Sequence, residues 1–181
     1  MEKKLIWLDL EMTGLDPNAE RIIEIYTCIT NEDLTEIIEG PGMVISQSKE
    51  LIDGMDEWNQ EHHSSSGLID EVLASKISEQ EAEQRTLEFI KQHVGKNESP
   101  LCGNTVWHDR KFLSLYMPEL EDYFHYRCID VSSVKELTKR WRPDINIQHA
   151  QKNAAHRAEA CLLYTSPSPR DRTRSRMPSS A

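Results

Sequence analysis

Three β-prone runs, rich in apolar residues and separated by polar segments, lie within the first 44 positions of the chain and predict three β-strands. The runs cover residues 4–10, 21–30 and 34–44, and Gly40-Pro41-Gly42 interrupts the third run. Turn-forming residues separate the runs. Strands that follow one another after short turns pair with their neighbours, so we expect an antiparallel meander.

Helical spacing of apolar residues begins after the third run. Short helices are predicted over residues 55–62 and 67–75. Ser78-Glu79-Gln80-Glu81 has the form of a capping box, in which two side chains satisfy backbone N–H groups at a helix N-terminus. A longer helix is therefore predicted to begin there and to continue to Val94.

Strands and helices alternate in the second half of the chain. Strands are expected over residues 100–104 and 126–131, and helices over residues 110–117, 133–141 and from 153 onward. Asp109 stands at the start of the first of these helices and Pro118 at its end, while Ser132 caps the second. The order predicts an α/β fold, with a mixed sheet that is an antiparallel meander followed by β/α units and is flanked by helices.

The composition narrows the class of protein. The 181 residues suffice for one domain with a core, and we expect a cytoplasmic protein without membrane contact, because the chain has neither a membrane-spanning apolar run nor a signal peptide. The four cysteines are scattered without a CxxC pair, which is typical of thiols in a reducing compartment. A formal net charge of −10 disfavours non-specific binding of long nucleic acids, whereas short substrates stay open.

Two carboxylates interrupt the apolar character of the first strand. Side chains two residues apart in a strand point to the same face, so Asp9 and Glu11 project together. Neighbouring carboxylates repel each other, and burying them unpaired costs free energy. The pattern predicts either a bound divalent cation or an edge strand with a solvated acidic face.

Motifs that occur in order along the chain resemble those of the DEDD-type 3′→5′ exonucleases. Asp9-Leu10-Glu11-Met12-Thr13-Gly14-Leu15 is similar to their first motif in the version carried by oligoribonucleases. Cys102-Gly103-Asn104 with Asp109–Leu113 resembles the second, and His156-Arg157-Ala158 resembles the opening of the third, His-x-Ala-x-x-Asp. The likeness covers about residues 4–160 and implies a ribonuclease H-like fold, a homodimer and degradation of very short RNA.

The resemblance assigns catalytic roles to four residues. Asp9, Glu11 and Asp109 would be metal ligands, and the cofactor would be two divalent ions, Mg²⁺ or Mn²⁺. Two such ions about 3.5–4 Å apart can activate a water and stabilise the leaving oxygen of a phosphodiester. His156 would be the general base that takes the proton of this water, because an imidazole titrates near neutrality.

Three further residues resemble positions that bind the dinucleotide substrate. Leu15 and Trp58 match positions on either side of the bases, and stacking of this kind tolerates any base. Tyr126 resembles a residue that the partner subunit offers. The alternative for Trp58 and Tyr126 is ordinary packing in the core.

Four other residues resemble a cap around the 5′ phosphate of the substrate: His63, Arg127, Ser132 and Lys135. Such a cap would make the enzyme count nucleotides without reading sequence, because phosphate contacts carry no information about the base. The alternative is a helix cap at Ser132 and a solvated charge at Lys135.

The chain departs from the family at the third motif. The motif needs Asp five residues after His156, and this position holds Cys161. A thiol is a poor ligand for Mg²⁺, whose sites use oxygen. Glu159 is no obvious substitute, because residues 159 and 161 lie about 200° apart around a helix axis. We therefore expect impaired activity from this chain.

Residues 161–181 differ in composition from the rest of the chain. They are rich in Pro, Ser and Arg without periodicity, whereas the family has a long helix here that packs on the sheet. The string Cys161–Asp171 is the in-frame translation of a common transposase-based sequencing adapter, and Ser175–Ala181 fits the distal end of this adapter. We expect an exonuclease domain at 1–160, with a non-native, disordered tail at 161–181 that leaves one face of the sheet uncovered. The alternative is a natural basic tail.

Two other functions stay open at this point. The first is another DEDD exonuclease, such as a polymerase proofreading subunit that acts on DNA ends, although Trp58, His63 and the pair Tyr126-Arg127 disfavour it. The second is a binding module that grips short nucleotides without cleaving them, and Cys161 is the feature that favours it.

Overall fold

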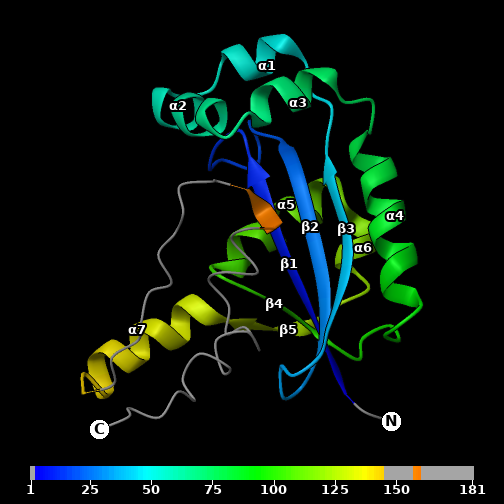
Figure 1. Ribbon diagram of the computed structural model, residues 1–181, viewed down its shortest axis with the longest axis vertical. Coiled ribbons are helices and arrows are strands. Elements are labelled where there is room, and N and C mark those ends of the chain that lie inside the picture. The colour runs from blue at the N-terminus through cyan, green and yellow to red at the C-terminus, as the bar shows by residue number, and fades with distance from the viewer. Residues whose placement is uncertain (1–2, 145–156, 160–181) are drawn as a thin grey trace, which may run out of the picture.

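A mixed sheet of five strands forms the centre of the computed structural model, which describes residues 3–144 and 157–159 (Figure 1). The strands are β1 (Lys4–Met12), β2 (Ile22–Asn31), β3 (Ile37–Val44), β4 (Pro100–Gly103) and β5 (His125–Asp130), in the spatial order β3-β2-β1-β4-β5. The first three pair antiparallel, while β4 runs parallel to β1 and β5 runs parallel to β4. The predicted meander and the α/β class with a mixed sheet are confirmed.

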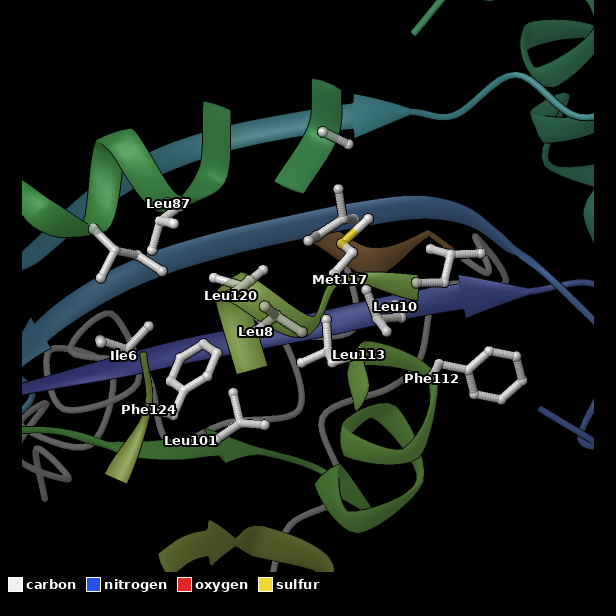
Figure 2. Close-up of a cluster of buried hydrophobic side chains, with 14 of the residues drawn as sticks. Ile6, Leu8, Leu10, Leu87, Leu101, Phe112, Leu113, Met117, Leu120 and Phe124 are labelled. Atoms are coloured by element: carbon white, nitrogen blue, oxygen red, sulfur yellow. The ribbon is translucent and has the colours of Figure 1, made fainter. Parts of the chain in front are cut away.

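Three helices cover one face of this sheet. They are α4 (Glu79–Lys91), α5 (Val106–Tyr116) and α6 (Pro118–Glu121). Alternate side chains of β1, namely Ile6, Leu8 and Leu10, enter this layer and meet Phe112 and Leu113 of α5 (Figure 2). Because these positions alternate along β1, the residues between them must point to the opposite face.

The opposite face of the sheet also carries a buried cluster. Trp7 lies there with Tyr26, Cys28 and Cys102, and Ala158 packs against them. These side chains are buried, while residues 161–181, for which the sequence predicts a tail that leaves one face uncovered, lie outside the described residues. The described part of the third motif therefore lies on the face of the sheet to which Asp9 and Glu11 belong.

Three short helices lie beyond the end of the sheet toward which β1 runs (Figure 1). They are α1 (Lys49–Asp53), α2 (Glu57–Ser65) and α3 (Leu68–Ala74). Leu68 and Val72 of α3 pack with Ile23 of β2, Ile52 and Met55 in a separate apolar cluster. This cluster fixes the short helices above the sheet end that bears the two carboxylates.

The last described helix, α7 (Val131–Trp141), follows the edge strand β5 and extends away from the sheet (Figure 1). None of its residues is buried, and Val134, Leu137 and Trp141 form an exposed apolar stripe at helical spacing. The helices within residues 3–144 and 157–159 lack the length and apolar character that crossing a membrane requires.

The start of α5 differs from the prediction, and two short helices, α6 and α1, were not predicted. α5 begins at Val106, so Asp109 lies inside the helix and not in front of it. Pro118 ends α5 as predicted but also opens α6, because a proline at the first helical position has no N–H that the helix would need. The sequence pattern does not predict α1.

The predicted cap of α7 is also wrong. The N-cap is Asp130, whose Oδ1 accepts hydrogen bonds from the backbone N–H of Ser132 (3.0 Å) and from its hydroxyl (2.6 Å). The predicted interruption of the third strand is wrong as well, since β3 passes through Gly40-Pro41-Gly42. The pairing is nevertheless irregular at this place, because Tyr26 faces Gly42 and Cys28 faces Glu39, so that Gly40 and Pro41 together stand opposite the single residue Thr27, as in a β-bulge.

Candidate active site

Asp9 and Glu11 lie on the same face near the carboxyl end of β1. Asp9 is 7% exposed, and Glu11 is half-buried. The antiparallel register places Glu24 of β2 directly opposite Glu11, and Glu24 is buried as well. Residues that face each other in such a pair share one side of the sheet, so two neighbouring strands contribute three carboxylates to this face.

Asp109 joins these carboxylates through the backbone of β1. β4 ends at Gly103, where a Cβ atom would lie 2.8 Å from the carbonyl oxygen of Leu8, so only glycine allows the two strands to approach this closely. Beyond Gly103, a side chain of α5 replaces β4 as the hydrogen-bond partner of β1: Asp109 Oδ1 accepts a hydrogen bond of 3.0 Å from the N–H of Leu10. The residue between Asp9 and Glu11 thereby anchors the carboxyl group of the second motif.

Burial raises the pKa of Asp109 to about 7. The hydrogen bond from Leu10 lowers the pKa but does not offset the burial, and the charge of Asp130 raises it further. A carboxyl group in this state is partly protonated at neutral pH, and a cation bound beside it would favour the ionised form. Asp109, only 5% exposed, is therefore a side chain whose environment fits a cation.

The donor set at the end of β1 consists of carboxylate oxygens, which hard divalent cations such as Mg²⁺ and Mn²⁺ prefer. Among residues 3–144 and 157–159, no three His, Cys, Asp or Glu side chains are grouped closely enough to hold a metal ion by themselves. His156 and Cys161, at two positions that the third motif would add, lie outside the described residues. Asp9, Glu11 and Asp109 fit a divalent cation by the chemistry of their carboxylate oxygens, and the hydrogen bond from Leu10 to Asp109 links the third carboxyl group to the strand that carries the other two.

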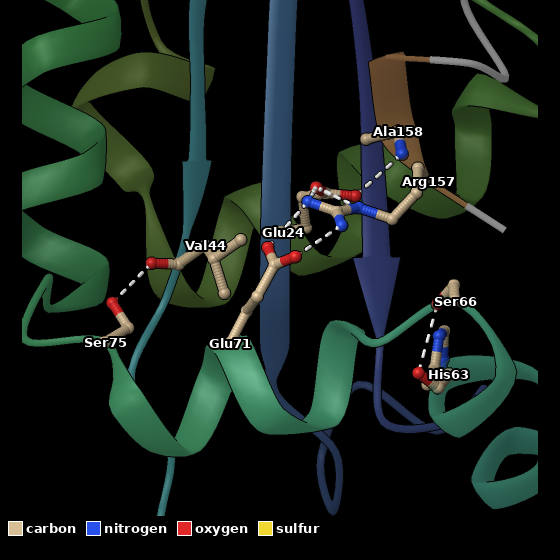
Figure 3. A network of polar contacts seen from close by, with 8 residues as sticks. All are labelled: Glu24, Val44, His63, Ser66, Glu71, Ser75, Arg157 and Ala158. Atoms are coloured by element: carbon tan, nitrogen blue, oxygen red, sulfur yellow. Dashed lines mark hydrogen bonds and ion pairs between the residues drawn. The ribbon is translucent and has the colours of Figure 1, made fainter. Parts of the chain in front are cut away.

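The structure describes Arg157, Ala158 and Glu159 of the third motif. Ala158 is buried, and its N–H donates a hydrogen bond of 2.8 Å to Glu24 Oε2. The guanidinium of Arg157 pairs with Glu24 and with Glu71 of α3 (Figure 3). The described residues of the third motif thus contact Glu24, which faces Glu11 near the end of β1.

Trp58 and Leu15 are both exposed, on α2 and just after β1. Core packing, the alternative for Trp58 and for Tyr126, is therefore wrong, because Tyr126 is exposed too. The indole of Trp58 stacks on the ring of His62 one turn further along α2, with ring centroids 3.9 Å apart and planes 24° apart. This pair presents an exposed aromatic surface on α2, the helix that also carries His63.

His63 lies close to the end of β1. Its side chain is buried, and its Nε2 lies 3.1 Å from the carbonyl oxygen of Met12, the last residue of β1. The hydroxyl of Ser66 donates to the carbonyl oxygen of His63 at 3.0 Å (Figure 3). The contact of His63 with Met12 attaches α2 to the strand that carries Asp9 and Glu11, and the bond from Ser66 closes the end of α2.

The other residues with a predicted substrate role lie at a different edge of the sheet. Tyr126 and Arg127 belong to β5, and Ser132 and Lys135 belong to α7. β5 is separated from β1 by β4, which corresponds to roughly 10 Å between the two strands. The structure therefore brings His63 to the end of β1 but sets the rest of the predicted phosphate cap apart from it (Figure 1).

The sequence prediction misses the polar partners of the third motif. Glu24 gave a signal, because a glutamate inside the apolar run Ile22–Ile25 stands out in a buried strand. Glu71 gave none, since an acidic residue in the first turn of a helix is ordinary.

The sequence of this chain is similar to those of proteins from one family of exonucleases. Residues 6–160 match the family model RNase_T, described as exonuclease. A protein from Shewanella loihica named oligoribonuclease is 54% identical over 157 residues, which are 87% of this chain and 86% of the relative. A protein of the same name from Legionella pneumophila is 55% identical over 143 residues, 79% of this chain and 76% of the relative.

Solved structures show the same fold at low sequence identity. The exonuclease I of E. coli in complex with a dT13 oligonucleotide has a TM-score of 0.64 and 16% identity over 91% of this chain. The zinc-bound form of an E. coli exonuclease I–DNA complex has a TM-score of 0.63 and 16% identity, also over 91% of this chain. The chain spans 39% of the length of each, so this likeness concerns one domain of a larger protein and confirms the expected ribonuclease H-like fold.

Proposed function

This chain belongs to the RNase_T exonuclease family and, within it, to the oligoribonucleases, and we propose that its substrates are very short RNAs. The enzyme is a 3′→5′ exoribonuclease, a hydrolase of phosphodiester bonds. The observation that carries the proposal is the 54% identity to a relative named oligoribonuclease over 86% of its length, and the hydrogen bond between Asp109 and Leu10, which joins the first two motifs, supports the exonuclease site. A DNA proofreading subunit is not favoured, because the relatives are named oligoribonucleases.

We assign the chemistry to four residues. Asp9, Glu11 and Asp109 would hold Mg²⁺ or Mn²⁺, which when bound activates water and neutralises charge on the phosphodiester. An imidazole nitrogen of His156 takes the proton from the attacking water. The support for His156 is its place in the sequence, directly before the segment Arg157–Ala158 that lies on the carboxylate face.

Substrate binding is assigned to the exposed apolar side chains near the carboxylates and to polar groups around them. Leu15 and Trp58 hold the two bases, and the exposure of both side chains supports this assignment. We propose that the 5′ phosphate is bound by His63 and, since β5 and α7 lie apart from His63 within one chain, by Arg127, Ser132 and Lys135 across the contact between two subunits.

A preference for the shortest substrates tests the function. We expect cleavage of a 5′-phosphorylated RNA dinucleotide in Mn²⁺ to be at least about tenfold faster than removal of one nucleotide from a ten-nucleotide RNA, because a capped dinucleotide makes all its contacts at once. The two rates should be measured on the Cys161→Asp variant and on the chain as printed. Equal rates on both substrates, or faster cleavage of DNA ends, would contradict the proposal.

The same assay on Trp58→Ala tests whether this side chain stacks on a base of the substrate. The KM for the dinucleotide should rise about tenfold, because one stacking contact between a base and an aromatic ring is worth about 1–3 kcal/mol. Leu73→Ala on α3, which removes another exposed apolar side chain, should leave the KM unchanged. An unchanged KM in Trp58→Ala would exclude Trp58 from substrate binding.

We propose that the enzyme is a homodimer and that α7 and β5 form the contact. The support is the exposed stripe of Val134, Leu137 and Trp141 on a helix without any buried residue, next to an edge strand. Tyr126 lies in the same strand and would reach the partner's substrate there.

Sedimentation of matched variants tests the dimer. The chain should sediment at twice its mass of 20.9 kDa, and Leu137→Asp should sediment as a monomer, because a charge in the apolar stripe would be buried unpaired. Leu73→Asp on α3 replaces a leucine of similar exposure and should remain a dimer. A monomeric parent chain, or a dimeric Leu137→Asp, would contradict the proposed interface.

We place the protein in the reducing cytoplasm. The support is that Cys28, Cys102 and Cys128 are free thiols, and burial raises the pKa of the Cys28 thiol to about 12, which keeps it unreactive. Fractionation of cells with an antibody against the protein checks this location, and recovery from an oxidising compartment would exclude it.

A further inference from the structure

Arg157 is held by acidic residues from two different elements (Figure 3). Its Nε donates to Glu24 Oε1 at 2.8 Å, and its Nη2 lies 2.7 Å from the same oxygen. Nη1 and Nη2 donate to the two carboxylate oxygens of Glu71, each at 2.9 Å. The two terminal nitrogens of the planar guanidinium thus bind Glu71, while Nε and Nη2 bind Glu24. The single ammonium group of lysine cannot reproduce this arrangement.

The second oxygen of Glu24 binds the backbone next to Arg157. Glu24 Oε2 accepts the N–H of Ala158 at 2.8 Å, so one carboxylate holds both the side chain and the main chain of this segment. Only 7% of the Glu24 side chain is exposed, so removing its cationic partner would leave a buried charge unpaired. Glu71 is 49% exposed, and its pair with Arg157 is correspondingly weaker because solvent screens it.

The two partners of Arg157 belong to the two sides of the candidate active site. Glu24 stands opposite Glu11 in the sheet, and Glu71 lies on α3, which follows the helix that carries Trp58 and His63. The segment that pairs with both begins directly after His156 in the sequence. A displacement of the main chain at Arg157 would therefore change the path of the chain at the neighbouring residue.

We propose that Arg157 is a positioning residue whose ion pairs with Glu24 and Glu71 dock the third-motif segment on the carboxylate face and so determine where His156 is presented. This role rests on the proposed function, because it acts through the general base. Arg157 needs no contact with the RNA or with a metal ion in this role.

Amide hydrogen exchange tests the docking without any need for activity. In Arg157→Gln, the Ala158 amide should exchange at least about tenfold faster than in the parent chain, while the amide of Ile25 in the core of β2 keeps its rate. Arg85→Gln on α4, which breaks an exposed ion pair with Glu81, should change neither amide. Unchanged exchange at Ala158 in Arg157→Gln would overturn the docking, and a parallel rise at Ile25 would mean general destabilisation instead.

Steady-state kinetics tests the positioning. In the Cys161→Asp background, Arg157→Gln should lower kcat for dinucleotide cleavage about tenfold to a hundredfold and leave KM within about twofold, because a displaced base slows the reaction without removing a substrate contact. Arg157→Lys should recover part of the loss, since the charge is kept and the fork is not. Glu71→Gln should lower kcat less than Arg157→Gln does.

Failure of the proposed function gives a different result from failure of the positioning role. If a chain in which aspartate and a closing helix replace residues 161–181 does not cleave RNA at all, the proposed function is wrong, and the exchange of Ala158 alone decides whether Arg157 docks the segment. If Cys161→Asp cleaves RNA and the added Arg157→Gln leaves kcat unchanged, Arg157 does not act through His156. The same conclusion holds if Arg157→Gln raises KM by as much as it lowers kcat.

Discussion

A chain in which residues 161–181 are replaced by aspartate and an amphipathic closing helix should cleave a 5′-phosphorylated RNA dinucleotide at least about a hundredfold faster than the chain as printed. The reason lies in the third motif. Cys161 stands where the motif needs a carboxylate, and a thiol is a poor ligand for the hard cations that Asp9, Glu11 and Asp109 fit. The measurement is the initial rate with Mn²⁺ at equal protein concentration.

Single substitutions separate the ligand from the helix. Cys161→Asp restores the carboxylate alone, and Cys161→Ser restores an oxygen without a charge. We expect Cys161→Asp to recover part of the rate and Cys161→Ser to recover almost none, because a neutral hydroxyl does not balance the charge of a divalent cation. Equal rates for the printed and the restored chain would mean that the carboxylate is dispensable or supplied elsewhere.

The origin of residues 161–181 has its own test. We propose that the natural gene continues after Ala160 with Asp and a closing helix, and that the printed tail is translated sequencing adapter. The support is the match of Cys161–Asp171 and Ser175–Ala181 to one adapter in a single reading frame. Amplification of the gene from its source should give a different continuation, and recovery of Cys161 with this tail would refute the proposal.

Local pattern and motif order predicted most of the fold. Alternation in β1 assigned Leu8 and Leu10 to one face and Asp9 and Glu11 to the other, because the period of a strand is two. The capping box at Ser78 gave the start of α4, and the Ser78 side chain accepts the N–H of Glu81 as expected. These features depend only on neighbouring residues.

Features that depend on distant contacts were missed. Asp109 was expected in front of α5, but it lies inside the helix, and its bond to Leu10 spans 99 residues of sequence. The ion pair between Arg157 and Glu71 joins residues 86 positions apart and leaves no local signal. A sequence pattern names candidate side chains, whereas the three-dimensional fold decides which of them meet.

Asp109→Asn should make the metal-free protein more stable above pH 7, by up to about 4 kcal/mol, while abolishing cleavage in the restored chain. The pKa of Asp109 rises from 3.8 to about 7 on folding because the carboxyl group is buried. Asn keeps an oxygen that accepts the N–H of Leu10 but has no proton to lose. It cannot supply the charge that a divalent cation needs.

The sign of the pH dependence follows from the direction of this shift. Between about pH 4 and pH 7 the unfolded chain loses the proton of Asp109 while the folded chain keeps it, so the free energy of unfolding of the parent falls as the pH rises through this window. The two proteins should be equally stable near pH 3.5 and differ most above pH 7. Urea denaturation in EDTA at several pH values measures the difference.

Asp130→Asn is the matched control, because folding lowers the pKa of Asp130 whereas it raises the pKa of Asp109. Burial raises the pKa of Asp130, but hydrogen bonds from Ser132 and Thr105 outweigh burial and lower it. Removing the Asp130 charge should therefore destabilise the protein at neutral pH, and the loss should fade as the pH falls below 3.8.

Mg²⁺ or Mn²⁺ should stabilise the parent and not Asp109→Asn, because a bound cation favours ionised Asp109. A parent that is as stable as Asp109→Asn at pH 8 in EDTA would show that Asp109 ionises without cost and that burial does not prepare it for a cation.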